Sequence, residues 1–306
     1  MTIDKFSKLL RISYKFTLMT SGTHVMEKIL FGVAKRWIAG NTIDDALSAA
    51  KISYKNGMNV IINKLGEHHR SNQAIQNTIS EYKTIISSFR KWNVCGGISV
   101  KPTQIGLSKS MRECLQNFQS IIRSASLSQT FVWIDMESSD HTDKTIEIYQ
   151  SIFSKYERLG VALQANLKRT ENDLSDLLTI GAKIRLVKGA YRENSKIAYK
   201  SKEQIDANYE KLMKTLFEKG NEFGIATHDL RLIEKAKSYS REHQRKFEFQ
   251  MLRGIMDSIK PGLVRDGFSL AEYIPYGTNW LPYSIRRLKE RKRNILLLGS
   301  AFVSKY

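Results

Sequence analysis

The sequence predicts an α/β protein folded as a (β/α)8 barrel. Eight short β-branched or apolar runs alternate with polar turns and longer helical stretches along its 306 residues. This alternation is typical of a TIM-type barrel of eight parallel strands. A doubly wound open sheet alternates in the same way but usually has fewer strands. No GxGxxG sequence follows any of the runs, so a Rossmann domain is disfavoured.

The chain begins with a segment that is predicted to be helical up to about residue 50. Apolar residues recur there at helical spacing, at Phe6, Leu9, Leu10 and Phe16. Thr42 is a favourable helix N-cap, and the acidic Asp44 and Asp45 follow it in the first turn, where they complement the helix dipole. We therefore assign residues 1–56 to an N-terminal helical arm and residues 57–306 to the barrel domain.

The predicted strands are separated by segments long enough for crossover helices, such as residues 142–159 and 201–220. In chain order the strands span residues 58–63, 98–101, 131–136, 161–164, 184–188, 224–227, 247–251 and 272–276. Active sites of such barrels lie at the carboxyl ends of the strands. Polar side chains stand at or near almost every predicted end, namely Glu67, Lys101, Asp135, Gln164, Arg185, Lys188, Thr227, His228, Gln250 and Tyr273. One such residue is ordinary for a solvated strand end, but the whole ring predicts a functional site.

The charge balance is strongly basic. Lys and Arg number 49 against 30 Asp and Glu, which gives a net charge of +19 and a pI of about 9.8. Such a balance indicates attraction to nucleic acid or to an anionic membrane, or else only a lysine-rich proteome. No aromatic platform is interleaved with the basic residues, so nucleic acid is not expected as a partner. Basic residues gather at both ends, in residues 1–40 and 281–306.

The cysteines and the hydropathy pattern indicate the cellular compartment of the protein. Cys95 and Cys114 form no CxxC, and no second ligand stands at metal spacing from His228, so neither a disulfide framework nor a metal site is expected. Two cysteines fit a reduced cytoplasmic compartment. Charged residues interrupt the start of the chain, which argues against a secretory signal. The apolar run 295–303 is shorter than the roughly 20 residues of a spanning helix, so we expect a cytoplasmic protein that does not cross a membrane.

The string IRLVKGAY, residues 184–191, combines groups that suit a flat ligand. Arg185 offers a rigid fork of donors to a heteroaromatic ring. Gly189 and Ala190 are small enough to let the backbone approach a ligand closely. On the next strand, His228 suits contact with phosphate or adenine, or proton transfer, although a histidine taken at random is more often structural.

Two further pairs have both an ordinary and a functional interpretation. Glu248 and Gln250 share one face of the seventh strand, as part of a site or as plain alternation of polar and core positions. Lys101 and Asp135 end the second and third strands, which are neighbours in a barrel. They form either a simple ion pair or a site in which a desolvated Lys101 is the amine of a Schiff-base lyase or aldolase.

A helix is predicted after the eighth strand. One of its faces carries Tyr283, Arg286, Arg287 and Glu290. A planar guanidinium matches a carboxylate through two parallel hydrogen bonds. Two arginines beside a phenol therefore indicate a site for a small acidic ligand, with a solvated basic face as the alternative.

Taken together, these motifs resemble the FAD-dependent proline dehydrogenase family in its monofunctional bacterial or archaeal form. The matching strings are KPTQIG (101–106), WIDME (133–137), LQA (163–165), IRLVKGAY (184–191), ATHD (226–229), FEFQML (247–252) and YIPYG (273–277), followed by Trp280, Tyr283, Arg286, Arg287, Leu288 and Glu290. They occur in the family's order. The resemblance implies a distorted (β/α)8 barrel that holds FAD at its strand ends, with the last helix over the barrel mouth.

The resemblance also implies a role for each matching residue. The catalytic groups would be Lys101, Asp135 and Arg185, with Arg185 near flavin N5. The proline pocket would consist of Lys101, Asp135, Tyr191, Leu252, Tyr273, Tyr283, Arg286 and Arg287, and the last two would clamp the carboxylate. FAD would be held by Met136, Gln164, Arg185, Val187, Lys188, Gly189, Ala190, Thr227, His228, Gln250 and Glu290. Glu67 would pair with a clamp arginine as a gate.

The implied reaction is hydride transfer from the δ-carbon of L-proline to FAD, which gives Δ1-pyrroline-5-carboxylate and begins proline catabolism to glutamate. A membrane quinone would then accept the electrons, and peripheral association of the basic ends with the anionic inner face of the cell membrane would fit this acceptor. Asn63 and Arg253 depart from the family pattern, and both are expected to leave the core motifs untouched, although Arg253 stands where it could alter the pocket wall or the flavin edge. The rivals are the Schiff-base lyase or aldolase and, from charge alone, a nucleic-acid-binding protein.

Overall fold

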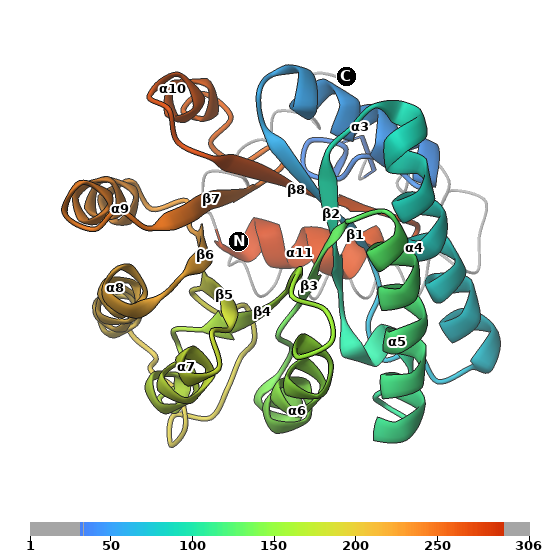
Figure 1. Cartoon of the computed structure of the whole chain (residues 1–306), viewed down its shortest axis with the longest axis horizontal. Coiled ribbons are helices and arrows are strands. Elements are labelled where there is room, and N and C mark those ends of the chain that lie inside the picture. Colours follow the sequence, from blue (N-terminus) through green and yellow to red (C-terminus); the bar gives the residue numbers. More distant parts are fainter. Residues whose placement is uncertain (1–30, 33, 291–306) are drawn as a thin grey trace, which may run out of the picture.

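The computed structural model describes residues 31–290 except residue 33, and within them eight strands close into one parallel barrel (Figure 1). The strands are β1 (Asn59–Lys64), β2 (Gly96–Val100), β3 (Phe131–Ile134), β4 (Leu159–Gln164), β5 (Lys183–Val187), β6 (Glu222–Ala226), β7 (Lys246–Leu252) and β8 (Leu270–Tyr276). Each strand pairs with the next one along the chain, and β8 pairs with β1. The predicted (β/α)8 fold is confirmed, and each predicted strand overlaps an observed one.

Helices surround the barrel and connect successive strands (Figure 1). They are α4 (Asn72–Trp92), α5 (Met111–Leu127), α6 (Thr142–Phe153), α7 (Thr170–Thr179), α8 (Lys202–Lys219), α9 (Leu230–Glu242) and α10 (Lys260–Arg265), with short 3-10 turns at Pro102–Ile105 and Ser139–His141. Apolar side chains between helices and strands form the main hydrophobic core, in which Tyr82, Phe118 and Leu216 are fully buried. Among the described residues, no helix is both long and apolar enough to cross a membrane.

Helix α3 (Ile43–Lys55) precedes the barrel and packs against β1, β8 and α4. Its start agrees with the prediction. The Thr42 hydroxyl accepts a hydrogen bond from the backbone N–H of Asp45 at 3.1 Å, and the Asp45 carboxylate accepts one from the backbone N–H of Thr42 at 2.9 Å. This capping box satisfies two amides that the helix itself leaves unpaired. The helical segment predicted around residues 6–16 and most of the two basic ends lie outside the described residues.

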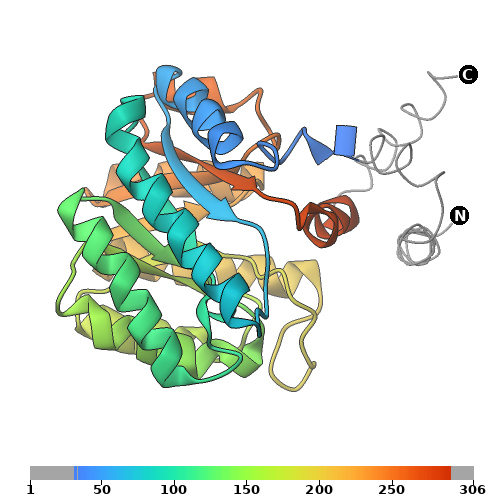
Figure 2. The same cartoon turned by 90° about the vertical axis from the view of Figure 1, so that its right-hand side faces the viewer.

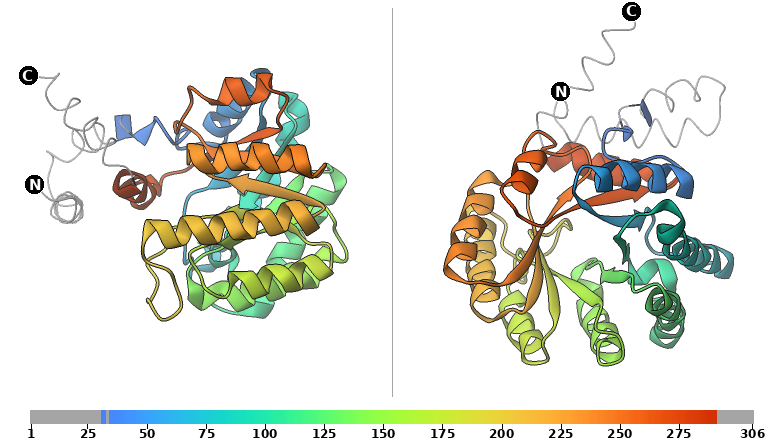
Figure 3. Two further views of the ribbon diagram at one scale, coloured as in Figure 1. Left: turned by 90° about the vertical axis from the view of Figure 1, so that its left-hand side faces the viewer. Right: turned by 45° about the horizontal axis from the view of Figure 1, so that its top comes forward.

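Helix α11 (Trp280–Glu290) lies across the end of the barrel toward which the strands point (Figures 1 and 2). Trp280, Leu281, Tyr283 and Ile285 pack there against Trp37 and its neighbours from the segment before α3, in a second hydrophobic cluster. The indole Nε1 of Trp37 donates a hydrogen bond to the Ser284 hydroxyl at 3.0 Å. The predicted helix over the barrel mouth is thus confirmed, and Figure 3 shows it beyond the ring of strands.

A third apolar cluster lies inside the barrel. It consists of Ile61, Trp133 and Ala271, with Phe131 and Tyr273 packed against it. The Trp133 indole needs space on the neighbouring strand, and Gly160 supplies it, because a Cβ at that position would overlap the ring. The interior therefore has an apolar layer, and the site begins on the side of this layer that faces the mouth.

Candidate active site

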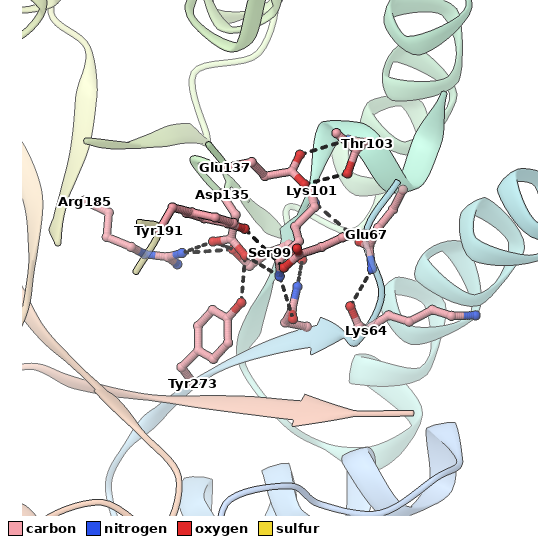
Figure 4. Close-up of polar contacts among 12 residues, drawn as sticks. Lys64, Glu67, Ser99, Lys101, Thr103, Asp135, Glu137, Arg185, Tyr191 and Tyr273 are labelled. Atoms are coloured by element: carbon pink, nitrogen blue, oxygen red, sulfur yellow. Dashed lines mark hydrogen bonds and ion pairs between the residues drawn. The ribbon is translucent and has the colours of Figure 1, made fainter. Parts of the chain in front are cut away.

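Asp135, which directly follows β3, is the centre of a polar network inside the mouth (Figure 4). Its Oδ1 accepts hydrogen bonds from Ser99 Oγ at 2.7 Å and from Arg185 Nη1 at 2.8 Å. Its Oδ2 accepts one from the Tyr273 hydroxyl at 2.7 Å and one from Lys101 Nζ at 3.3 Å. One carboxylate thus joins side chains from β2, β3, β5 and β8 or their ends.

The charges of this network are mutually stabilised. Burial alone would raise the pKa of Asp135, but the charges of Lys101 and Arg185, together with two hydroxyl hydrogen bonds, lower it below its ordinary value. Burial lowers the pKa of Arg185, yet a guanidinium stays protonated in proteins. Burial and the nearby carboxylate raise the pKa of Tyr273 well above its ordinary value, so its phenol remains a donor. Two cations, Lys101 and Arg185, and one anion, Asp135, give this network a net positive charge, which suits an anionic ligand.

Arg185 is only 3% exposed and is held from several directions. Its guanidinium carbon lies 4.5 Å from the centre of the Trp133 ring and 5.5 Å from that of Tyr273. Nη1 also donates to Ser99 Oγ at 2.9 Å, and Nε donates to Gln250 Oε1. Nη2 is buried and has no hydrogen-bond partner among the described residues. An electron-rich acceptor at the mouth would satisfy this donor.

Lys101 shares its ammonium between Asp135 and Asn63, whose Oδ1 lies 3.3 Å from Nζ. Asn63 is 1% exposed and also donates to the backbone oxygen of Ser99 at 2.8 Å. The expectation that Asn63 leaves the core motifs untouched is therefore wrong, because β1 lies directly beside β2. The predicted ion pair is present, and the side chains of Lys101 and Asp135 are 12% and 14% exposed.

Arg253 also contacts a family motif, contrary to expectation. Its backbone N–H donates to the backbone oxygen of Tyr273 at 3.0 Å, and its Nη1 lies 3.2 Å from Glu272 Oε2. Glu272 is also paired with Lys260 of α10 at 2.7 Å and accepts a hydrogen bond from Ser53 of α3 at 2.7 Å. Arg253 therefore belongs to a buried polar cluster that fixes α3 and α10 against β8.

The loops after β1 and β5 meet at the mouth. The Tyr191 hydroxyl donates to Glu67 Oε1 at 3.1 Å (Figure 4). His68, the next residue, has a φ of +57°, and its ring lies 5.7 Å from that of His141 in the loop after β3. Glu67 is thus linked to the loop after β5 at the mouth, and its role as a gate stays a prediction. Its predicted pairing with a clamp arginine stays a prediction.

Helix α11 carries the predicted clamp. Tyr283 is buried, Arg287 is half-buried, and the Arg287 guanidinium lies 5.3 Å from the centre of the Tyr283 ring. The contact follows from their spacing of four residues on a helix. The side chains of Arg286 and Glu290 lie outside the described part of the chain, so their roles also stay predictions.

Several predicted cofactor contacts lie at the rim of the mouth. Gly189 and Ala190 are exposed, and Gly189 has a φ of +106°, which favours glycine. His228 and Thr227 follow β6, and Thr227 is 3% exposed, with its hydroxyl accepting a hydrogen bond from the backbone N–H of Asp229 at 3.2 Å. His228 Nε2 accepts a hydrogen bond from the backbone N–H of Leu252 at 2.9 Å, so the neutral ring carries its proton on Nδ1. Val187 is half-buried at the end of β5.

The side chains of four other predicted contacts pack or bond within the protein, and their roles toward the cofactor stay predictions. Met136 lies in the main hydrophobic core. Gln164 is 2% exposed and donates to a backbone oxygen of the loop after β3 at 2.9 Å. The Lys188 ammonium is paired with an aspartate of α8 and with the N-cap aspartate of α9. Gln250 lies behind Arg185, deeper in the barrel.

Sequence reasoning missed Ser99 and Trp133. Each stands two residues before a predicted site residue, Lys101 and Asp135, and so shares its strand face. Ser99 bonds Arg185 and Asp135, and Trp133 stacks on the Arg185 guanidinium. The alternation of strand side chains is the signal that would have identified them.

The fold and the network define a class of protein, a (β/α)8 barrel with a buried network of net positive charge at its mouth that suits a small anionic ligand. A family model described as proline dehydrogenase matches residues 46–296. The chain is 34% identical over 265 residues to Proline dehydrogenase 2 of Bacillus subtilis (strain 168), which covers 86% of this chain and 88% of that one. It is 30% identical over 273 residues to the Proline dehydrogenase of Deinococcus radiodurans, with 87% and 88% covered. The chain belongs to the proline dehydrogenase family of oxidoreductases, as the motifs predicted.

Solved structures share the fold. Proline utilization A (PutA) from Bdellovibrio bacteriovorus, inactivated by N-propargylglycine, matches with a TM-score of 0.80 and 25% identity, over 87% of this chain and 33% of that chain. PutA from Corynebacterium freiburgense matches with a TM-score of 0.75 and 20% identity, over 97% of this chain and 35% of that one. The chain therefore spans about a third of the length of these larger proteins.

Proposed function

We propose that this chain binds FAD at the barrel mouth and oxidises L-proline to Δ1-pyrroline-5-carboxylate, the first step of proline catabolism to glutamate. The observation that carries the proposal is the Arg185 guanidinium, rigidly held and with its buried Nη2 lacking a partner among the described residues. The exposed backbone at Gly189 and Ala190 and the polar Thr227 and His228 fit the remaining parts of the cofactor. When bound, FAD supplies the hydride acceptor, and the protein supplies orientation and electrostatics.

The substrate carboxylate would lie beneath α11. Arg287, with Arg286 beside it in the sequence, provides the planar donors that match a carboxylate. Lys101 has three N–H donors, of which two are directed at Asp135 and Asn63 in the described part of the chain. The third is available to the substrate.

The pocket walls and the fixed charges would orient the pyrrolidine ring. The Tyr273 ring is held by its hydrogen bond to Asp135, and Tyr283 packs under Arg287. Holding the substrate in a near-attack geometry converts a bimolecular encounter into an oriented transfer. Arg185 would supply a preorganised positive charge near the bound flavin, which would lower the barrier without solvent rearrangement.

We also propose a membrane quinone as the electron acceptor, with peripheral binding to the anionic inner face of the cell membrane. The support is the sequence of residues 281–306, with seven Lys or Arg against one Glu. The test is co-sedimentation with vesicles. Stronger binding to anionic than to neutral vesicles is expected, and equal binding would remove the membrane proposal while leaving the enzymatic one intact.

The substitution Arg287→Met tests the carboxylate clamp. Losing one partner of a desolvated charge pair costs about 2–5 kcal/mol of binding, so the KM for L-proline should rise by a factor of about 30 or more. Arg90→Met is a matched control, because Arg90 is exposed in the last turn of α4, and it should leave KM unchanged. An unchanged KM in Arg287→Met would refute the clamp.

A further inference from the structure

Behind Arg185, toward the amino ends of the strands, two side chains of β7 continue the polar network. Gln250 Oε1 accepts the hydrogen bond from Arg185 Nε, and Gln250 Nε2 donates to Glu248 Oε1 at 3.1 Å. The other carboxylate oxygen of Glu248 accepts from Asn59 Nδ2 at 2.7 Å and from Ser269 Oγ at 3.2 Å. These contacts form a continuous polar column, Glu248–Gln250–Arg185, through the interior of the barrel.

The hydrogen-bonding chemistry of Arg185 and Glu248 fixes the orientation of the Gln250 amide between them. A guanidinium can only donate hydrogen bonds, and an ionised carboxylate can only accept them. Gln250 stands between the two, so its amide oxygen must face Arg185 and its amide nitrogen must face Glu248. Turning the amide over would set donor against donor at one end and acceptor against acceptor at the other. The carboxylate at the far end therefore supports the amide orientation that holds Arg185.

The column defines the plane of the Arg185 guanidinium. Nε is fixed by Gln250, and Nη1 is fixed by Asp135 at 2.8 Å. Two anchored nitrogens leave the flat group no freedom to rotate, and the Trp133 ring at 4.5 Å covers one of its faces. The direction of Nη2, which lacks a partner among the described residues, follows from these anchors.

The barrel leaves room for this column. Gly224 on β6 lies opposite Glu248 in the strand register. A Cβ at position 224 would stand 2.7 Å from Gln250 Nε2, closer than packed atoms allow. Gln250 itself is 4% exposed. Glu248 and Gln250 also line a cavity of about 270 Å³ at the amino end of the barrel, away from the substrate mouth.

We propose that Glu248 and Gln250 are positioning residues that act on the reaction through Arg185 and touch neither substrate nor FAD. They set the orientation of the guanidinium, and so the reduction potential of the bound flavin and the rate of hydride transfer. The inference rests on the proposed flavin chemistry. It also gives Gln250 a different role from the cofactor contact that the sequence predicted.

The test uses the FAD-loaded protein and three substitutions. Gln250→Leu removes the acceptor of Arg185 Nε, and Glu248→Gln is isosteric and removes the charge that orients the amide. Glu222→Gln is the matched control, because Glu222 lines the same cavity and pairs with Lys183 and Lys246 instead of Arg185. For each protein, the midpoint potential of the flavin, kcat, and the Kd of a carboxylate inhibitor that competes with proline are measured.

In Gln250→Leu we expect kcat to fall about tenfold and the flavin potential to fall by about 30 mV, which is a tenfold change for a two-electron couple. Inhibitor Kd should stay within about twofold, because α11 is untouched. Glu248→Gln should move both quantities in the same direction by a smaller factor, and Glu222→Gln should match wild type.

The inference is overturned if Gln250→Leu has the wild-type potential and kcat, or if Glu222→Gln loses as much as Gln250→Leu does. Should Gln250→Leu fail to fold, Glu248→Gln decides, and a wild-type potential and kcat in that variant are the contrary result. These outcomes differ from failure of the proposed function, in which L-proline does not reduce the flavin of the wild-type protein at all.

Discussion

The carboxylate of Asp135 bonds four groups, and replacing it by an amide should be costly. Its side chain is 14% exposed and forms ion pairs with Arg185 at 2.8 Å and with Lys101 at 3.3 Å. Removing one partner of a buried ion pair costs about 3–5 kcal/mol. Asn keeps one acceptor oxygen, so we expect the loss of stability in Asp135→Asn to lie near the lower end of this range, at about 3 kcal/mol. For a chain of this size that corresponds to a fall in Tm of roughly 5–10 °C.

The pH dependence makes the prediction specific. Because the folded-state pKa of Asp135 is lowered, its stabilisation is fully present above the unfolded-state pKa of about 4 and is lost as pH falls through the folded-state pKa. Thermal denaturation followed by circular dichroism should therefore give a constant difference in Tm between wild type and Asp135→Asn from about pH 5 to pH 8. This difference in Tm should become smaller only below about pH 4.

The control is Asp143→Asn, which breaks a surface pair with Arg169 in which Asp143 is 82% exposed. Exposed pairs contribute about 0–1 kcal/mol, so this variant should melt close to wild type. A Tm for Asp135→Asn that equals the control, or a gap that closes between about pH 5 and pH 8, would refute the assignment of Asp135 as the ionised centre of the network.

Two further predictions concern the barrel interior. Gly160→Ala should destabilise the fold by about 1–3 kcal/mol, because the added methyl group overpacks against Trp133. Gly262→Ala is the control and should not lower the Tm, since nothing lies within 4 Å of a Cβ at that position. Equal Tm values for the two variants would contradict the packing argument. Burial raises the pKa of Glu248 despite its hydrogen bonds, so ionising it opposes folding as pH rises above the unfolded-state value of about 4.3. Glu248→Gln should therefore have a higher Tm than wild type at pH 7 and no advantage below about pH 4; a lower Tm at pH 7 would contradict this sign.

The fold was predictable because each strand is a short β-branched or apolar run followed by a polar turn. The ring of polar strand ends also predicted the mouth, and Asp135, Arg185 and Tyr273 do meet there. Their meeting depends only on parallel strands ending at one face of a closed barrel. Local pattern was sufficient for this part of the site.

Depth and side-chain direction were less predictable, because they depend on where each strand ends. β3 ends at Ile134, so Met136 has already left the strand and turns into the core. β7 continues to Leu252, which leaves Gln250 inside the barrel rather than at its rim. Contacts between residues far apart in the sequence could not be predicted from local pattern. The contact between Asn63 and Lys101, for example, depends on the register of β1 against β2.

The most direct test of the account is the visible spectrum of the purified protein, recorded anaerobically before and after addition of L-proline. We expect the absorption bands of an oxidised flavin before addition and their loss afterwards, with a much higher proline concentration needed in Arg287→Met. A colourless protein that gains no flavin bands when supplied with FAD, or flavin bands that persist at saturating L-proline, would contradict it.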